Sequence, residues 1–287
     1  MKIDQNPFSI YDFLGYLVPG VLFAYSLFFL VCVDYCNIPI VMLPDVKIEW
    51  VFIILFCCYL LGHILSYLSS ISIELFSIWS LGYPSRYLMN YGNRGFWSHL
   101  FTNNPKRNPI VHVLIVFLRL FMCIYILPAT ITDLLFRKLL KTKSILGKPM
   151  DIYSIALIED KIHEFIAEKY NIEKLKELEV ESQAPIDFFR FIYHYTCEST
   201  KNHFGKMQNY VALYGFTRTI CFTSITLFWV LLIQIAFWGY QTNMCYFLIA
   251  IFVLSCVMYL DFNKFYRKFS LEVLMTFSVI YNRVYSA

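Results

Sequence analysis

Residues 51–73 read VFIILFCCYLLGHILSYLSSISI, a run of 23 residues that contains no Asp, Glu, Lys or Arg. An α-helix rises about 1.5 Å per residue, so about 20 apolar residues are enough to cross a hydrocarbon core of roughly 30 Å. A segment of this length and composition is typical of a transmembrane helix. The run therefore predicts that the chain enters a lipid bilayer.

Comparable runs recur along the chain. Residues 13–33, 219–240 and 244–260 also lack charged side chains, and a fifth run, 110–132, is interrupted by His112 and Arg119. Apolar residues make up 59% of the sequence, charged residues only 15%, and the mean hydropathy is +0.57. Soluble domains are nearer to about 45–50% apolar. The sequence thus predicts an all-α, polytopic membrane protein.

The basic residues favour one topology over another. If four runs span and the N-terminus lies inside, the outer loop 34–50 contains one cation, Lys47, and 23 of the 24 Lys and Arg lie on the inner side. If all five runs span, several cations move outside and Arg119 enters the membrane. The positive-inside rule favours four spans with both termini cytoplasmic. Five spans remain the alternative.

The fifth run differs from the other four in its flanks. NPKRNP precedes it at 104–109, FRKLLKTK follows it at 136–143, and Pro128 lies near its end. These features favour a re-entrant or interfacial segment. We expect four parts: a first transmembrane helix pair (1–80), an interfacial loop with the embedded apolar segment (81–150), a cytoplasmic helical region (151–218), and a second transmembrane pair with a C-terminal amphipathic tail (219–287).

The cytoplasmic region begins with an amphipathic pattern. In DIYSIALIEDKIHEFIAEKY, apolar residues recur at steps of three and four, and Asp151 precedes them as a candidate N-cap. A second helix is expected to start near Asp187, and KMQNYVALYGFTRTICF is expected to continue into the third span. We expect the inner helices to pack on one another, on the inner membrane surface, or on a partner.

Polar residues in the second span form the main candidate site. His63, Ser66, Ser70 and Glu74 fall within one sector of a helix with a 100° rotation per residue, and Gly62, Ser69 and Ile73 lie beside that sector. One interpretation is a pore or proton path, because ionisable residues inside a membrane are candidate functional sites. The other is a close helix–helix contact through Gly62, Ser66 and Ser70, with Glu74 marking the inner end. The glycine and serine spacing favours the helix contact, whereas His63 is the residue that still supports the pore or proton-path interpretation.

Other polar residues are interpreted more simply. Arg119 is expected to reach lipid headgroups, and Asp12 and Arg218 are expected to be ordinary interface residues. Ser66 lies three residues from His63, but no third orienting group and no G-x-S-x-G motif accompany them, so we expect no enzyme. The sequence has no Cys/His spacing for a metal and no phosphate-binding loop, so we expect no cofactor. The net charge of +4 is explained by Lys and Arg residues kept on the inner side of the membrane and by their contact with anionic lipids, so we expect no direct nucleic-acid binding.

Three stretches carry a resemblance to other proteins. IYDFLGYLVPG (10–20), YLLGHILSYLSS in the second span, and QNYVALYGFTRTICF (208–222) resemble a loosely defined group of uncharacterised bacterial multipass inner-membrane proteins, some encoded near anti-phage defence genes. The resemblance implies a bacterial inner-membrane location and a role in phage defence. It implies no catalytic residues.

These observations lead to two functional hypotheses. The first is a non-enzymatic protein of a bacterial defence or stress system, an oligomeric sensor or scaffold that acts through its cytoplasmic helices on a cytosolic protein partner. The second is a pore-forming effector that depolarises the membrane when triggered.

Overall fold

The computed structural model describes residues 12–32, 48–91, 109–136, 147–169, 188–200, 203–239 and 242–281. These ranges contain helices and short connections and no strand, which confirms the predicted all-α class. Four helical stretches are long and apolar enough to cross a membrane: Phe13–Leu30, Trp50–Leu88, Phe204–Phe237 and Asn243–Ile280. The chain is thus a polytopic membrane protein.

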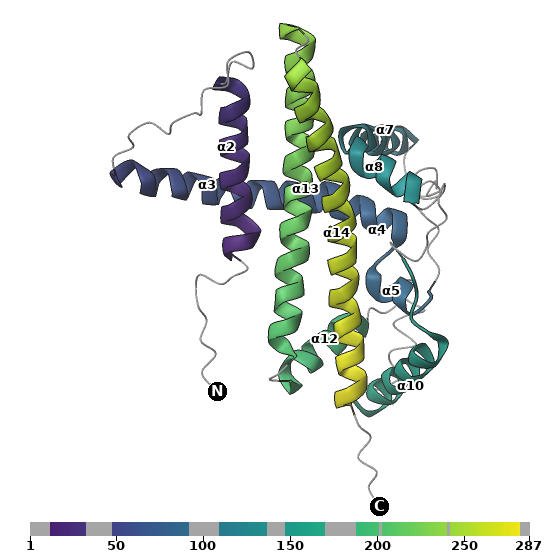
Figure 1. Ribbon diagram of the computed structural model, residues 1–287. Coiled ribbons are helices and arrows are strands. Elements are labelled where there is room, and N and C mark those ends of the chain that lie inside the picture. The colour runs from purple at the N-terminus through teal and green to yellow at the C-terminus, as the bar shows by residue number, and fades with distance from the viewer. Residues whose placement is uncertain are drawn as a thin grey trace, which may run out of the picture.

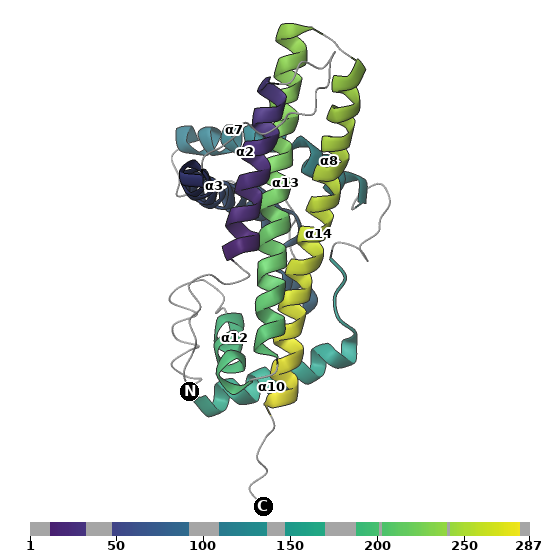
Figure 2. The same ribbon diagram turned by 60° about the vertical axis from the view of Figure 1, so that its left-hand side comes forward.

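The longest elements form an antiparallel hairpin. Helices α13 (Phe204–Trp238) and α14 (Thr242–Ile280) lie side by side (Figures 1 and 2). At about 1.5 Å per residue they measure roughly 52 and 58 Å, well beyond the roughly 30 Å of a hydrocarbon core. Gly239, with φ 93°, ends α13. The expected continuation of the 206–222 segment into the third span is confirmed.

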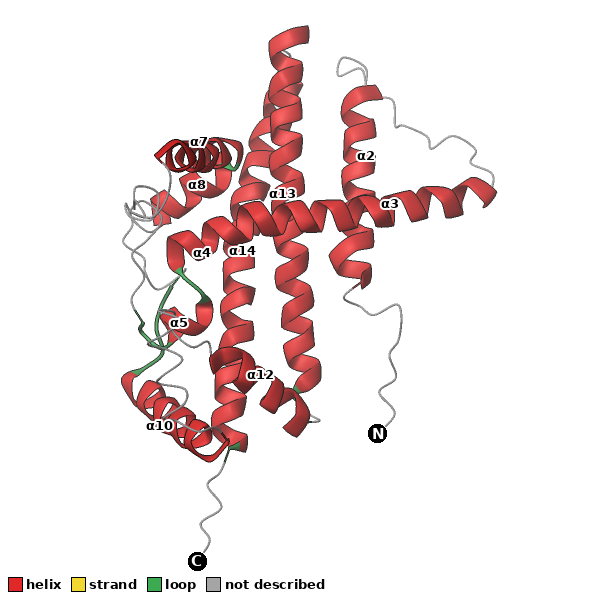
Figure 3. Cartoon of the chain, turned by 180° about the vertical axis from the view of Figure 1, so that it is seen from behind, coloured by secondary structure: helices red, strands yellow, loops and turns green. Residues whose placement is uncertain are grey.

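The first half of the chain packs around this hairpin. The π-helical turn η1 (Phe13–Leu17) leads into α2 (Val18–Cys32), which runs alongside α13. Helix α3 (Ile48–Ser69) runs across both, and it continues through the π-helical turn η2 (Ser70–Glu74) into α4 (Leu75–Leu81) (Figure 3). A short helix, α5 (Pro84–Leu88), follows where an irregular loop was expected.

The fifth apolar run is a bent pair of helices. Helix α7 (Pro109–Tyr125) and α8 (Leu127–Leu134) meet at an angle of 89° around Ile126. Proline lacks a backbone N–H and its ring opposes the preceding helical turn, so Pro128 accounts for a break at this place. The expectation that residues 110–132 do not form one straight helix is confirmed.

Two shorter helices surround the end of the hairpin where α13 begins and α14 ends, which is the inner end in the expected topology. Helices α10 (Ile152–Lys169) and α12 (Phe188–Ser199) pack against α14. Their contact is a buried cluster, called the inner cluster from here on, formed by Phe165, Ile166, Ile192, Met207, Phe269, Val273, Phe277 and Tyr281. Asp151 accepts a hydrogen bond from the backbone N–H of Ser154 at 2.8 Å, which confirms the predicted N-cap. Asp187 lies outside the described residues, and α12 begins just after it.

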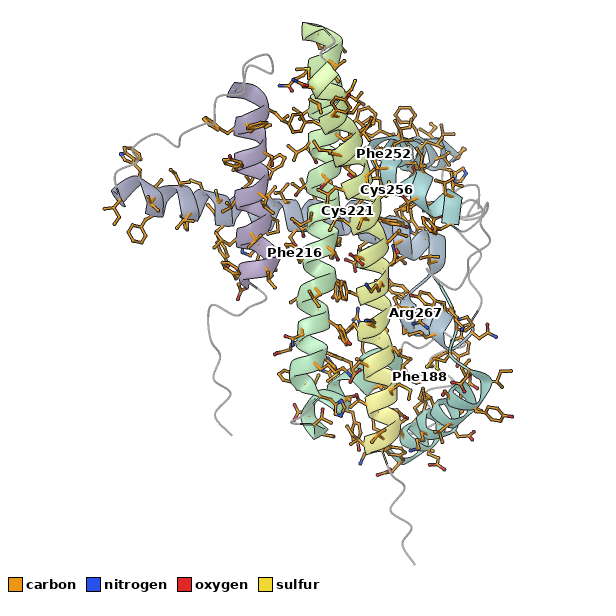
Figure 4. All side chains as sticks on the ribbon, in the orientation of Figure 1. Phe188, Phe216, Cys221, Phe252, Cys256 and Arg267 are labelled. Carbon is orange, nitrogen blue, oxygen red and sulfur yellow. The ribbon has the colours of Figure 1, made fainter. Side chains whose placement is uncertain are left out.

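The central core lies where α3, η2 and α4 cross the hairpin. It contains Leu65, Ile73, Phe76, Ile126, Ala129, Cys221, Phe222, Ile225, Tyr259 and Phe262. Cys221 and Cys256 lie at this level on α13 and α14 (Figure 4). The Cys221 thiol donates to the carbonyl of Ser255, and the Cys256 thiol to that of Pro128. Cys221 packs as a small core residue, whereas Cys256 is half-buried. The division into four sequence regions stays a prediction.

Candidate functional site: a buried ion pair where α3 and α13 cross

Arg218 is a buried cation at the start of the uncharged part of α13. Its residue exposure is 8%, and no charged side chain follows it in that helix. One guanidinium nitrogen, Nη1, donates to the Glu74 carboxylate, and Nε donates to the Ser69 hydroxyl at 3.0 Å. Nη2 lies 3.3 Å from the Ser66 hydroxyl and 3.4 Å from the Ser66 carbonyl. One cation therefore gathers three side chains from the α3–η2 segment.

The π-helical turn η2 brings Ser69 and Glu74 to the same side. In a regular α-helix, residues five apart are rotated by about 140°, so both could not face one neighbour. A π-turn closes i to i+5 hydrogen bonds and inserts a residue into the helical repeat, which reduces that rotation. Glu74 is the last residue of η2 and Ser69 immediately precedes it. Such insertions occur frequently at functional sites.

Two serine hydroxyls of the α3–η2 segment also donate within their own helix. The Ser69 hydroxyl donates to the carbonyl of Ser66 at 2.7 Å, so its lone pair is left to accept from Arg218. The Ser72 hydroxyl donates to the carbonyl of Leu68 at 2.6 Å. Because the Ser69 and Ser72 hydroxyls each have a local acceptor, these two serines lie in an apolar environment without isolated donors.

The ion pair is well shielded from water. The side chains of Arg218 and Glu74 are 10% and 22% exposed. Removing one member of such a pair leaves the other charge buried without compensation, which typically costs about 3–5 kcal/mol, whereas the net worth of the intact pair is much smaller. The pair therefore links the α3–η2 segment to α13, and breaking it from one side is expected to be costly.

Gly62 lies in a different contact from Glu74. A Cβ atom on Gly62 would lie 1.9 Å from the carbonyl oxygen of Tyr16, and one on Gly20 would lie 1.9 Å from the carbonyl oxygen of Cys58. The backbones of α3 and of the η1–α2 segment therefore touch directly at this pair of glycines. Small residues permit such close approach between helices.

The remaining residues of the predicted stripe point elsewhere. His63 is exposed; its ring stacks on Tyr16 with centroids 3.8 Å apart and meets Tyr59 edge-on at 4.6 Å. The Ser70 hydroxyl donates to the carbonyl of Tyr67 in its own helix at 2.9 Å. Of the five residues, the structure brings only Ser66 and Glu74 together, on Arg218.

Arg119 is half-buried, and its guanidinium carbon lies 4.7 Å from the centroid of the Trp79 ring. A cation within about 6 Å of an aromatic face is attracted to it. This contact joins α7 to α4. The expected contact of Arg119 with lipid headgroups stays a prediction.

The interpretation of Arg218 as an ordinary interface residue is wrong. Its neighbourhood is set by a helix 144 positions away in the chain, so periodicity around Arg218 could not reveal it. The available signal is that Glu74 and Arg218 are opposite charges, each at the end of an uncharged run. Asp133 was also missed: it is 1% exposed and accepts a hydrogen bond from the Ser80 hydroxyl at 2.7 Å.

These features define a polytopic, all-α membrane protein with an ion pair buried between two of its helices. Among the described residues, no group of three His, Cys, Asp or Glu could hold a metal ion. Comparison of the chain with known protein families, with curated proteins and with solved structures finds no match. The resemblance to bacterial inner-membrane proteins therefore stays a prediction.

Proposed function

We propose that this protein is a bacterial inner-membrane component of a defence or stress system, and that it acts as an oligomeric sensor or scaffold through its cytoplasmic helices. The observation that carries the proposal is the continuity of α13 and α14. Each helix runs without a break from an uncharged half into a half that packs against α10 and α12. A change in the membrane half is thereby transmitted to the inner helices.

Two sets of contacts support a relay of this kind. The Arg218–Glu74 pair fixes α13 against the transverse α3–η2 segment near the middle of the protein. Ile192 and Phe165 fix α12 and α10 against the inner ends of the hairpin. A movement of α3 or of the hairpin is thus coupled to the surface that the inner helices present to the cytosol.

The test is phage protection in a bacterium that produces the full chain. We expect the wild type to lower the efficiency of plating of at least one phage in a broad panel. Ile192→Ala, which opens a cavity in the inner cluster, should abolish this protection. Phe191→Ala, at the neighbouring 45% exposed position, is the matched control and should retain it. Wild-type plating equal to the empty vector with every phage would contradict the proposal.

The pore-forming alternative is favoured by one observation, the exposed His63 within the uncharged run 51–73. A voltage-sensitive dye in the same cells distinguishes the two functions. A pore predicts depolarisation on triggering that His63→Leu or Ser70→Leu abolishes. A sensor or scaffold predicts that neither substitution changes protection and that the membrane potential is maintained.

A further inference from the structure

Helix α10 carries apolar side chains on two sides. Ile158, Phe165 and Ile166 are buried against the inner cluster and its neighbours. On the other side, Ile152, Tyr153 and Leu157 are 82%, 88% and 52% exposed. Large apolar side chains exposed together outside the spans are a feature of interaction surfaces.

Carboxylates continue the same side of α10. From Tyr153 the helix reaches Leu157, Asp160 and Glu164 at steps of four, three and four, so these four residues share one face. Residues 151–169 contain five carboxylates and two lysines, a net charge of −3, whereas the whole chain is +4. We call the group Ile152, Tyr153, Leu157, Asp160 and Glu164 the α10 surface.

The charge and position of the α10 surface argue against a lipid partner. The inner leaflet is anionic, and it repels carboxylates. Lys161 of α10 donates to the carbonyl of Ser278, 18 residues beyond the end of the uncharged run at residue 260. At about 1.5 Å per residue this places the contact roughly 27 Å along α14 from the apolar half. Figure 1 shows α10 at the inner end of the hairpin.

From these observations we propose that the α10 surface docks an amphipathic helix of a soluble protein, with an apolar face flanked by Lys and Arg. The inference rests on the proposed function, since it specifies the partner of the inner helices. Tyr153, Leu157 and Ile152 supply the apolar anchors, and aromatic anchors often dominate such contacts. The exposed Asp160 pairs with the basic flank, which sets orientation and speeds association.

The experiment places a photo-crosslinking amino acid at Tyr153 of the full chain in living bacteria. We expect an adduct with one soluble protein, and at least a tenfold lower yield when Asp160→Lys is added. Glu198→Lys, an exposed charge reversal on α12, is the matched control and should leave the yield unchanged. In nanodiscs, a synthetic helix of Leu and Lys at helical spacing should bind at least tenfold more tightly than its Leu and Glu counterpart.

An adduct with a second copy of the chain, or with lipid, would overturn the proposal. The photo-crosslinking amino acid at Tyr246, in the apolar half of α14, is the positive control for the cross-linking reaction. If this control forms an adduct and position 153 forms none, the proposal is also overturned. A yield indifferent to Asp160→Lys would overturn it too. Cross-linking needs no phage, so the two proposals can fail separately. If the chain gives no protection against phage but the adduct forms, the proposed function is refuted and the α10 surface is not. If the chain protects against phage but no adduct forms, only the proposal for the α10 surface is refuted.

Discussion

At the scale of single residues, the cation at Arg218 has more contacts than any other feature of the site. Its three donor nitrogens reach Glu74, Ser69 and Ser66, all on the α3–η2 segment. The Arg218 side chain is only 10% exposed, so these protein groups supply most of its polar contacts. Energetic coupling between the two charges is therefore the most direct consequence of the fold.

We expect Arg218→Met and Glu74→Gln each to lower the free energy of unfolding by about 3–5 kcal/mol, because each leaves a buried polar partner uncompensated. The double variant should recover part of this loss, giving a coupling energy of about 1–3 kcal/mol. Equilibrium unfolding of the purified protein in detergent measures all four species.

An exposed ion pair in the same protein is the control for this cycle. Lys264 and Asp261 lie 3.3 Å apart with side chains 54% and 34% exposed. Lys264→Met should change stability by less than about 1 kcal/mol. Additive effects of Arg218→Met and Glu74→Gln would show that the two charges do not interact as described.

The glycine contact gives a second prediction at this scale. Gly62→Ala places a Cβ against the backbone carbonyl of Tyr16, which cannot rotate away as a side chain would. We expect the free energy of unfolding to fall by about 1–3 kcal/mol, as for other overpacked contacts. Gly205→Ala meets nothing within 4 Å and should be neutral or stabilising. Equal effects of the two substitutions would refute a close crossing at Gly62.

At the scale of elements, α10 is attached to the end of α14 through a titratable pair. The Tyr281 hydroxyl donates to the Glu168 carboxylate at 2.9 Å. Burial, and then the bond to Glu168, raises the pKa of Tyr281 to about 12. Hydrogen bonds from Lys169 and then Tyr281 hold the pKa of Glu168 below its usual value. Both shifts favour the pair at neutral pH.

The sign of each shift sets a pH window for this attachment. A raised tyrosine pKa contributes stability below its ordinary value of about 10, and this contribution is lost as the pH rises towards 12. A lowered carboxyl pKa contributes above its ordinary value of about 4.3, and this is lost on acidification. We expect Tyr281→Phe to remove part of the stability loss between pH 10 and 12, measured by unfolding across that range. An unchanged profile would contradict the pairing.

At the scale of the whole molecule, the direction of α3 has a consequence for topology. Helix α3 runs across α2, α13 and α14 in Figures 1 and 3, so the membrane normal cannot follow all four helices equally. The bent pair α7–α8 is either a broken span or a re-entrant segment. Because of both features, the topology is best tested by measuring on which side of the membrane each connecting segment lies.

We expect reporter insertions to place position 47 outside, and positions 2, 91 and 287 in the cytoplasm, because this arrangement keeps 23 of 24 cations inside. Five spans would instead place position 47 inside and positions 2 and 91 outside. Finding positions 47 and 91 on the same side would show that α3 lies along the membrane rather than through it, and would refute four crossings.

The sequence by itself determined the class of protein, the apolar runs, the break around Pro128 and the cap at Asp151. These depend on composition and on the repeat of a single helix, so neighbouring residues suffice. Only the tertiary structure decided that Ser66 and Glu74 face Arg218, that Gly62 meets Tyr16, and that His63 points outward. The physical reason is that a helical wheel assigns residues to a side of one regular helix. The π-turn at Ser70–Glu74 alters that wheel, and which neighbour covers each side depends on residues as far as 152 positions away in the chain.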